Sequence, residues 1–207
     1  MAGKFITFEG IEGCGKTTQI KLIDAYLRQK GFKTVLTREP GGTKIGDNIR
    51  HLLLDPNNKE MHPRTELLLY SASRAQHVEE LIKPAMNDGK IVLCDRYTDS
   101  TVAYQGAARR LDMQTIDGIN KIATDSLKPY LTLIFDLPTK EGLARAKKRS
   151  ALDRFEQEAP DFHERVRQGY LAIASREPAR VKIINGAGSI DDIHKEVIKI
   201  LDASTRP

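Results

Sequence analysis

The chain has 207 residues, of which 40% are hydrophobic and 29% are charged, and its formal net charge is +5. This length suits one α/β domain spanning residues 1–207, and the composition is that of a soluble globular protein with a sizeable core. The positive net charge does not indicate nucleic-acid binding, because most Lys and Arg residues are interspersed with Asp and Glu along predicted helices.

Other protein classes are excluded by what the sequence lacks. No stretch approaches the roughly 18 apolar residues that a membrane span needs, and the first residues lead directly into a predicted strand without the layout of a signal peptide. Cys14 and Cys94 are too few for a disulfide framework and belong to no zinc-binding pattern. We therefore expect a cytoplasmic protein with reduced thiols that acts on neither membranes nor nucleic acids.

Short apolar runs alternate along the chain with longer segments in which apolar residues recur at helical spacing. The runs predict buried parallel strands at residues 4–9, 33–37, 91–95, 131–137 and 181–185. Parallel strands need crossover connections, which are usually helices. The alternation therefore predicts a three-layer α/β fold, in which a five-stranded parallel sheet is flanked by helices on both faces.

The stretches between the runs have a helical period. Apolar residues recur at helical spacing in them, among others Ile20, Ile23, Leu27, Leu67 and Leu68. The last helix is predicted to begin after Ser189, whose side chain can cap free backbone N–H groups together with Asp192.

A phosphate-binding loop follows the first predicted strand. Residues 10–17, GIEGCGKT, match the pattern GxxxxGK[ST] between a strand and a helix. The glycines let backbone N–H groups converge on a phosphate, and the helix N-terminus adds partial positive charge behind them. Lys16 is expected to bridge the β- and γ-phosphates and Thr17 to ligate Mg²⁺, whereas Thr18 either joins the site or only packs. The predicted nucleotide-binding residues are Gly10, Ile11, Glu12, Gly13, Cys14, Gly15, Lys16, Thr17 and Thr18.

An acid and an arginine close the third predicted strand beside this loop. Asp95 is expected to hold Mg²⁺ through water or to position an acceptor phosphate, and Arg96 to bind that phosphate; a plain surface ion pair is the alternative. Arg38, Arg50 and Arg74 are expected to converge on the same cleft, whereas each of them taken alone would be interpreted as a plain surface residue. Together they indicate a doubly charged acceptor. A phosphate monoester, whose second pKa is about 6, is already mostly dianionic at neutral pH and needs no base to become a nucleophile.

Four longer motifs resemble the thymidylate kinase family in its bacterial form, over essentially the whole chain. They are FEG at 8–10 running into the phosphate-binding loop, TREPGGT at 37–43, DRY at 95–97 with STVAYQG at 100–106, and LDRFE at 152–156. The resemblance implies a P-loop NTPase fold with a short lid at about residues 147–156. It also implies phosphoryl transfer from ATP to dTMP in dTTP biosynthesis, Mg²⁺ bound with ATP, and a homodimer packed through helices.

The resemblance also assigns roles around the acceptor. Tyr70 is expected to stack on thymine, with Arg74 on the edge of the base, and Tyr104 to pack against the sugar C2′. Glu12 is expected to meet the 3′-hydroxyl, and Arg50 and Arg96 the phosphate. Thr101 and Gln105 match base-contacting positions, and the full expected substrate set is Glu12, Arg38, Glu39, Arg50, Tyr70, Arg74, Arg96, Ser100, Thr101, Tyr104 and Gln105.

The lid is expected to supply charge to the transition state. Residues 140–154 hold six basic residues against two acidic ones, and no basic residue occupies the variable positions of the phosphate-binding loop. We therefore expect catalysis from Lys16, Asp95 and Arg96 together with Arg149 and Arg154 of the lid. The histidines are expected to be surface or packing residues: His51, His62, His77, His163 and His194.

Three other interpretations remain open at the level of sequence. A P-loop kinase acting on a neutral hydroxyl is disfavoured by the arginines around the acceptor. A nucleotide-dependent switch that binds nucleic acid lacks an aromatic and basic RNA-binding pattern. A catalytically silent binding module is disfavoured because the lysine, threonine and acid that the chemistry needs are all present.

Overall fold

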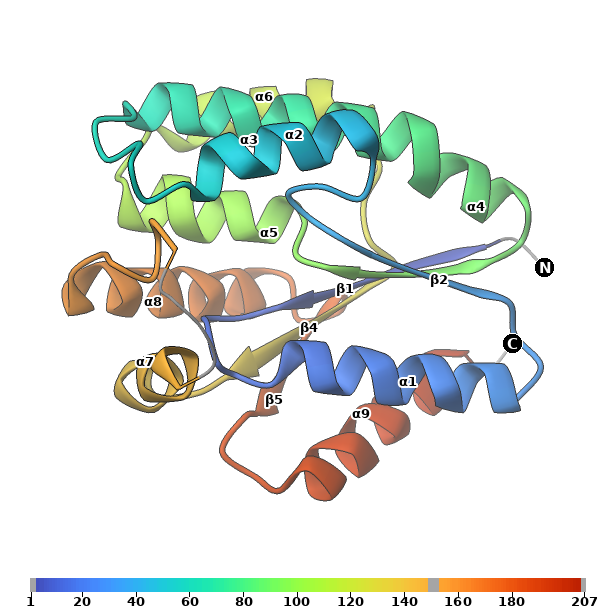
Figure 1. Ribbon diagram of the computed structural model, residues 1–207. Helices are drawn as coiled ribbons and strands as arrows, with labels where there is room; N and C mark the ends of the chain where they lie inside the picture. The colour runs from blue at the N-terminus through green and yellow to red at the C-terminus, as the bar shows by residue number, and fades with distance from the viewer. Residues whose placement is uncertain (1–2, 149–152, 206–207) are drawn as a thin grey trace.

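Five parallel strands form the middle layer of the computed structural model, which describes residues 3–148 and 153–205 (Figure 1). The strands are β1 (Lys4–Glu9), β2 (Thr34–Arg38), β3 (Ile91–Asp95), β4 (Leu131–Asp136) and β5 (Val181–Asn185). The predicted bounds of β1, β3 and β5 are confirmed. β2 begins one residue later than predicted, and it also ends one residue later because Arg38 still pairs with Asp95. β4 ends one residue earlier than predicted, because its last paired residue is Asp136, opposite Asn185.

The order of the strands is β2-β3-β1-β4-β5, with β1 in the centre. In this register Asp95 of β3 is level with both Phe8 of β1 and Arg38 of β2. Three strands therefore end together, and the segments that follow them emerge side by side. In open parallel sheets, ligands bind at the carboxyl ends of the strands, next to the strand from which the sheet is extended on both sides. Here that strand is β1.

Helices cover both faces of the sheet, as predicted. In Figure 1, α1 (Lys16–Gln29) and α9 (Ile190–Thr205) lie below the sheet, and α3 (Pro63–His77), α4 (Lys83–Asn87) and α6 (Met113–Thr124) lie above it. Two π-helical turns, which are rare and are often found at functional sites, continue α3 and α5. The remaining elements are α2 (Lys44–Leu54), η1 (Val78–Ile82), α5 (Thr98–Thr101), η2 (Val102–Ala108), α7 (Thr139–Lys147) and α8 (Pro160–Arg176).

The core follows the predicted periodicities with one exception. Ile20, Ile23 and Leu27 of α1 are buried, but Leu68 of α3 is 57% exposed beside the buried Leu67. Successive positions of α3 point to different sides, so only Leu67 of this pair reaches the core.

Other features of the sequence are also confirmed. Ser189 accepts a hydrogen bond from the backbone N–H of Asp192 at the start of α9. Cys14 and Cys94 are buried free thiols. Of the described helices, none has the length and apolar content that crossing a bilayer requires.

Two glycines bring the phosphate-binding loop into direct contact with α7. A Cβ atom on Gly142 would lie 2.6 Å from the carbonyl oxygen of Glu12, and one on Gly13 would lie 2.2 Å from the carbonyl oxygen of Gly142. Gly13 also has a φ of +73°, which side chains disfavour. The backbone of α7 therefore supports the loop with no side chain between them.

We predict that Gly142→Ala destabilises the protein by about 1–3 kcal/mol, because the added methyl group must push α7 away from the loop. Ser175→Ala is the control, since Ser175 is exposed on α8. The control should be neutral or slightly more stable, because alanine favours a helix. Urea unfolding of both variants tests this, and equal unfolding free energies would contradict the close contact.

Candidate active site

A cleft of about 840 Å³ opens at the carboxyl edge of the sheet. The loop after β1 forms one end of it, and the loop after β2 with residues of α2, α3, α5 and η2 forms the other. Most of the residues predicted for the site line this cleft: Glu12, Gly13, Cys14, Gly15, Lys16, Thr17, Thr18, Arg38, Glu39, Arg50, Tyr70, Asp95, Arg96, Ser100, Thr101, Tyr104 and Gln105.

The phosphate-binding loop is held open by its own glycines and lysine. Gly10, Gly13 and Gly15 all have positive φ values, of 134°, 73° and 95°. The ammonium of Lys16 donates to the carbonyl oxygens of Gly10 at 3.0 Å and Ile11 at 2.9 Å. The N-cap residue of α1 is Gly15, which has no side chain to cap the helix, so the first N–H groups of α1 face the cleft as an anion site.

A hydroxyl and a carboxylate lie together beside the loop. The Thr17 hydroxyl donates to Oδ2 of Asp95 at 3.4 Å, and Oδ1 of Asp95 is buried with no hydrogen-bond partner among the described residues. Hydroxyl and carboxylate oxygens are the ligands that Mg²⁺ takes in nucleotide sites. The donor set and the unsatisfied oxygen therefore fit the ion that sequence analysis expects here.

Arg96 is aimed into the cleft by an unusual backbone. Its φ is +72°, in the left-handed region that arginine rarely adopts, and its N–H donates to the carbonyl oxygen of Phe8 at 3.0 Å. The guanidinium donates to Oε1 of Glu12 at 2.8 Å and to the hydroxyl of Tyr170 at 3.1 Å. Backbone strain of this kind costs about 1–3 kcal/mol and is concentrated at functional sites.

Glu12 is held as an anion in the same cluster. Its Oε1 atom also accepts a hydrogen bond of 2.6 Å from the Tyr104 hydroxyl. Burial acts to raise the pKa of Glu12, but the charges of Arg96 and Lys16 outweigh it and lower the pKa. Oε2 is buried with no hydrogen bond to any residue that the structure describes, and it lies 3.8 Å from Nδ1 of the buried His163.

Three arginines gather at the acceptor end of the cleft, and two of them, Arg38 and Arg96, are paired with acids. Burial lowers the pKa of Arg50, and the nearby charges of Arg38 and Arg96 lower it further. Arg50 donates to the carbonyl oxygen of Pro40 at 3.0 Å, and Arg38 is paired with Asp47 at 3.1 Å. This mutual repulsion favours a site for a dianion such as a phosphate group.

Aromatic rings line the cleft beside these arginines. Tyr70 packs edge-on against Phe155, with ring centroids 5.9 Å apart, and Tyr104 packs against the same ring at 5.7 Å. Burial raises the pKa of Tyr70 above its ordinary value, so its hydroxyl remains neutral. A flat base can stack in such surroundings.

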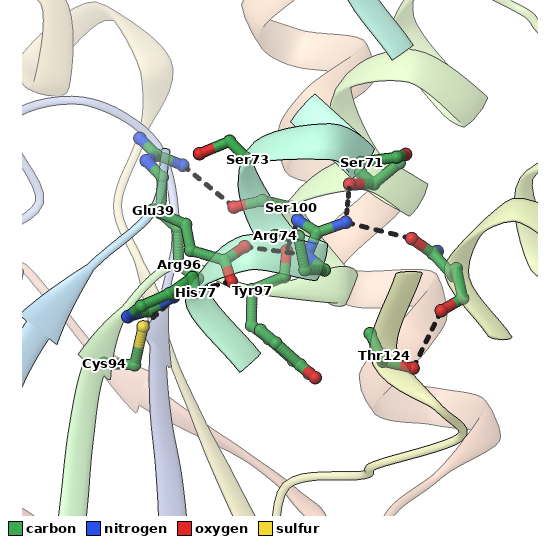
Figure 2. A network of polar contacts seen from close by, with 12 residues as sticks. Glu39, Ser71, Ser73, Arg74, His77, Cys94, Arg96, Tyr97, Ser100 and Thr124 are labelled. Atoms are coloured by element: carbon green, nitrogen blue, oxygen red, sulfur yellow. Dashed lines mark hydrogen bonds and ion pairs between the residues drawn. The ribbon is translucent and has the colours of Figure 1, made fainter. Parts of the chain in front are cut away.

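Arg74 is not brought into the cleft as predicted. The side chain is 1% exposed, and its guanidinium donates to Glu39 Oε2 at 2.7 Å, Thr101 Oγ1 at 2.8 Å and the Tyr97 carbonyl oxygen at 3.0 Å. Figure 2 shows Arg74 in the middle of this network, with His77 also on Glu39. The donors of Arg74 are used by these partners, so its guanidinium holds Glu39 and Thr101 of the cleft in place from the protein interior.

Arg154 is also placed differently from the expectation. Its guanidinium is buried and donates to Oε2 of Glu66 at 2.6 Å and to the carbonyl oxygen of Leu53 at 2.8 Å. It does not line the cleft, although Phe155 beside it does. Arg149, the other predicted lid arginine, lies outside the described residues.

The sequence reasoning missed Glu9. This buried carboxylate accepts hydrogen bonds from the Ser100 hydroxyl at 2.6 Å, the Tyr170 hydroxyl at 2.8 Å and the Tyr97 backbone N–H at 2.7 Å. Ser100 and Tyr170 also contact Arg96, so Glu9 orients the groups around that guanidinium. The available indication was an acid in the FEG motif at the end of a largely buried strand, and nothing in the pattern of α8 singled out Tyr170.

Comparisons with known proteins show which family the chain is similar to. Residues 8–197 match the family model described as thymidylate kinase. The chain is 55% identical over 197 residues to a thymidylate kinase of Geotalea daltonii, covering 92% of each chain, and 51% identical over 205 residues to one of Geobacter sulfurreducens, covering 96% of each. It is also similar to the crystal structure of a thymidylate kinase from Ehrlichia chaffeensis, with 36% identity and a TM-score of 0.78 over 97% of this chain and 99% of that one.

Glu9 predicts a specific dependence of stability on pH. Burial, reinforced by the charge of Asp99, raises the pKa of Glu9 from 4.5 to about 7. Between these values the native protein keeps a proton that the unfolded chain releases, so the free energy of unfolding falls as pH rises. We predict that the free energy of unfolding of Glu9→Gln falls less steeply with pH than that of the parent, by up to roughly 1.4 kcal/mol per pH unit. Denaturant unfolding at several pH values measures it, and parallel curves for the two proteins would contradict it.

Proposed function

The chain belongs to the thymidylate kinase family, and on that premise we propose that its cleft binds ATP and dTMP end to end. The protein transfers the γ-phosphoryl group of ATP to dTMP, giving dTDP and ADP. The observation that carries the proposal is the group of arginines, Arg38, Arg50 and Arg96, that meets the glycine-rich loop across one cleft.

The donor half of the site is the loop after β1. Lys16 exchanges the carbonyl oxygens of Gly10 and Ile11 for the β- and γ-phosphates, while the free N–H groups of α1 bind the β-phosphate. Thr17 and Asp95 would hold Mg²⁺, Asp95 directly or through water, and when bound there the ion would supply positive charge beside the phosphate oxygens.

The acceptor half holds a dianion that needs no general base. Arg96 and Arg50 bind the phosphate of dTMP, and Arg38 adds charge from the edge of the cleft. Because the acceptor phosphate is already the nucleophile at neutral pH, catalysis consists of aligning two anions and stabilising the charge between them.

The base and sugar are recognised by the aromatic end of the cleft. Thymine stacks on Tyr70, with Thr101 and Gln105 at its polar edge. Tyr104, whose hydroxyl is fixed by Glu12, packs against the sugar C2′ and favours a deoxyribose, and Glu12 reaches the 3′-hydroxyl. Arg74 acts indirectly, because it holds Glu39 and Thr101 in place.

The lid arginines remain part of the proposal in a modified form. A role for Arg154 at the phosphates requires it to leave Glu66, since its guanidinium is paired there. Arg149, which lies outside the described residues, is the other arginine that we propose supplies charge to the transition state.

The protein acts as a homodimer in the cytoplasm. Large apolar side chains are exposed on three helices that pack in the order α2, α3, α6 and lie together at the top of Figure 1. Ile45 and Leu52 of α2, Leu68 of α3 and Ile122 of α6, which is 85% exposed, make up this surface, which we call the apolar helix face. A second copy of the chain is its partner, as the family resemblance implies.

We predict that Arg96→Ala raises the KM for dTMP at least about tenfold and that for ATP less than about threefold, because a charged hydrogen-bond pair to the phosphate is lost. Alanine is strained by the positive φ at position 96 in the same way as arginine. The substitution therefore reports on the loss of the guanidinium and not on a change in backbone strain. Arg176→Ala, exposed on α8 outside the cleft, is the control and should leave both constants unchanged. Steady-state kinetics with each nucleotide varied provide the measurement; equal rises for dTMP and ATP would refute the assignment.

We also predict that Leu68→Glu converts the dimer to a monomer, because a charge buried without a partner in an apolar interface is costly. Ile190→Glu is the control, since Ile190 is equally exposed at 57% but begins α9 on the opposite face of the sheet. Sedimentation velocity should give twice the 23.2-kDa chain mass for the parent and the control. A parent that sediments as a monomer would overturn the dimer proposal.

A further inference from the structure

A buried carboxylate on α3 faces the amide of Gln105. Glu66 is fully buried, and its Oε1 atom accepts a hydrogen bond of 2.8 Å from Nε2 of Gln105. Its other partners are guanidinium groups: Arg154 donates to Oε2 at 2.6 Å, and Arg109 donates to both oxygens at 3.2 Å. Among the described residues, every hydrogen bond to the Glu66 carboxylate therefore comes from an N–H donor.

This surrounding fixes which way the amide of Gln105 points. A glutamine amide has nearly the same shape after a half-turn that exchanges its oxygen and nitrogen, so only its partners decide between the two orientations. A carboxylate flanked by two guanidiniums accepts hydrogen bonds and donates none. The NH₂ group must face Glu66, because the reversed amide would set two acceptors against each other.

The rest of the amide belongs to the cleft. Gln105 lies in η2 and lines the cleft together with Tyr70 and Thr101. No described residue donates a hydrogen bond to its Oε1 atom. With one N–H on Glu66, the amide is left with an oxygen that accepts and a second N–H that donates.

This pair of groups distinguishes pyrimidines by elementary chemistry. Thymine has an N3–H donor next to the O4 acceptor, whereas cytosine has an N3 acceptor next to the N4 amino donor. An amide held in one orientation matches thymine and opposes cytosine, and the reversed amide does the opposite. Without an anchor, one glutamine could serve both bases.

We propose that Glu66 is a specificity-determining residue that acts through Gln105, because it locks the amide in the orientation that accepts from N3–H of thymine. The inference rests on the proposed function in one respect, namely that Gln105 meets the edge of the base. It goes further in assigning discrimination against cytosine to a residue that does not line the cleft.

The test uses Glu66→Gln and compares two nucleotides in the same enzyme. The new amide can turn its own NH₂ toward Gln105, which permits Gln105 to reverse. We measure the KM for dTMP and the inhibition constant of dCMP against dTMP. Their ratio should move toward dCMP by at least about tenfold, as expected when one base-edge pair is no longer enforced. Because both nucleotides share ATP and the phosphate-binding arginines, effects on Arg154 cancel in the ratio.

Three further variants separate the possible causes. Arg109→Gln removes another ion pair from Glu66 without touching the Gln105 contact, and it should keep the ratio of the parent even if its melting temperature falls. Glu66→Asp retains an acceptor-only group and should also keep the ratio, within about threefold. Gln105→Leu removes the amide itself and should lose the discrimination.

The outcomes distinguish the inference from the function on which it rests. An unchanged ratio in Gln105→Leu would show that this residue does not read the base. A changed ratio in Gln105→Leu with an unchanged one in Glu66→Gln would overturn the role of Glu66 alone. If Glu66→Gln does not fold, a tenfold shift in Glu66→Asp or in Arg109→Gln would equally contradict the locking of the amide.

Discussion

A guanidinium surrounded by buried carboxylates is the interaction on which the rest of the site depends. Arg96 is held directly by Glu12 and, through Ser100 and Tyr170, by Glu9. Charges taken out of water are tolerated only when they are paired and hydrogen-bonded, so these groups stabilise one another's positions. The arrangement joins the end of β1, the end of β3 and α8, and it therefore sets where an acceptor phosphate meets the loop that binds the donor.

Behind the cleft lies a second polar layer with a different character. Its members Arg74 and His77 both hold Glu39, which lines the cleft (Figure 2), and their other hydrogen-bonding groups are taken by Thr101, Tyr97 and Thr37. Within the described residues, several of the unpaired buried polar atoms lie at or beside the cleft, including Asp95 Oδ1, Glu12 Oε2 and an Nη atom of Arg154. Unpaired atoms are costly, so their position marks where ligands complete the hydrogen bonds. The layer whose hydrogen bonds are complete makes the site rigid, and the unpaired atoms at the cleft are the ones that bind ligands.

Much of the fold could be predicted because it is encoded locally. The apolar runs gave the strands within one residue at each end, and the glycine pattern located the phosphate-binding loop and its lysine. Strand order could not be predicted, since it depends on pairings such as Phe8 with Asp95 that are distant in sequence. The positions of Arg74 and Arg154 were missed for the same reason. An arginine near a site has the same local pattern whether it faces a ligand or a buried partner such as Glu66, 88 residues away.

The left-handed backbone at Arg96 places stability and activity in opposition at one position. Glycine is the residue that adopts a φ of +72° without strain. A chain selected only for resistance to heat would gain by exchanging this arginine for glycine, and it would then lose the charge that meets the acceptor. Retaining arginine here means that the native state remains somewhat less stable than its fold permits, so gains in thermal stability must come from positions remote from this turn.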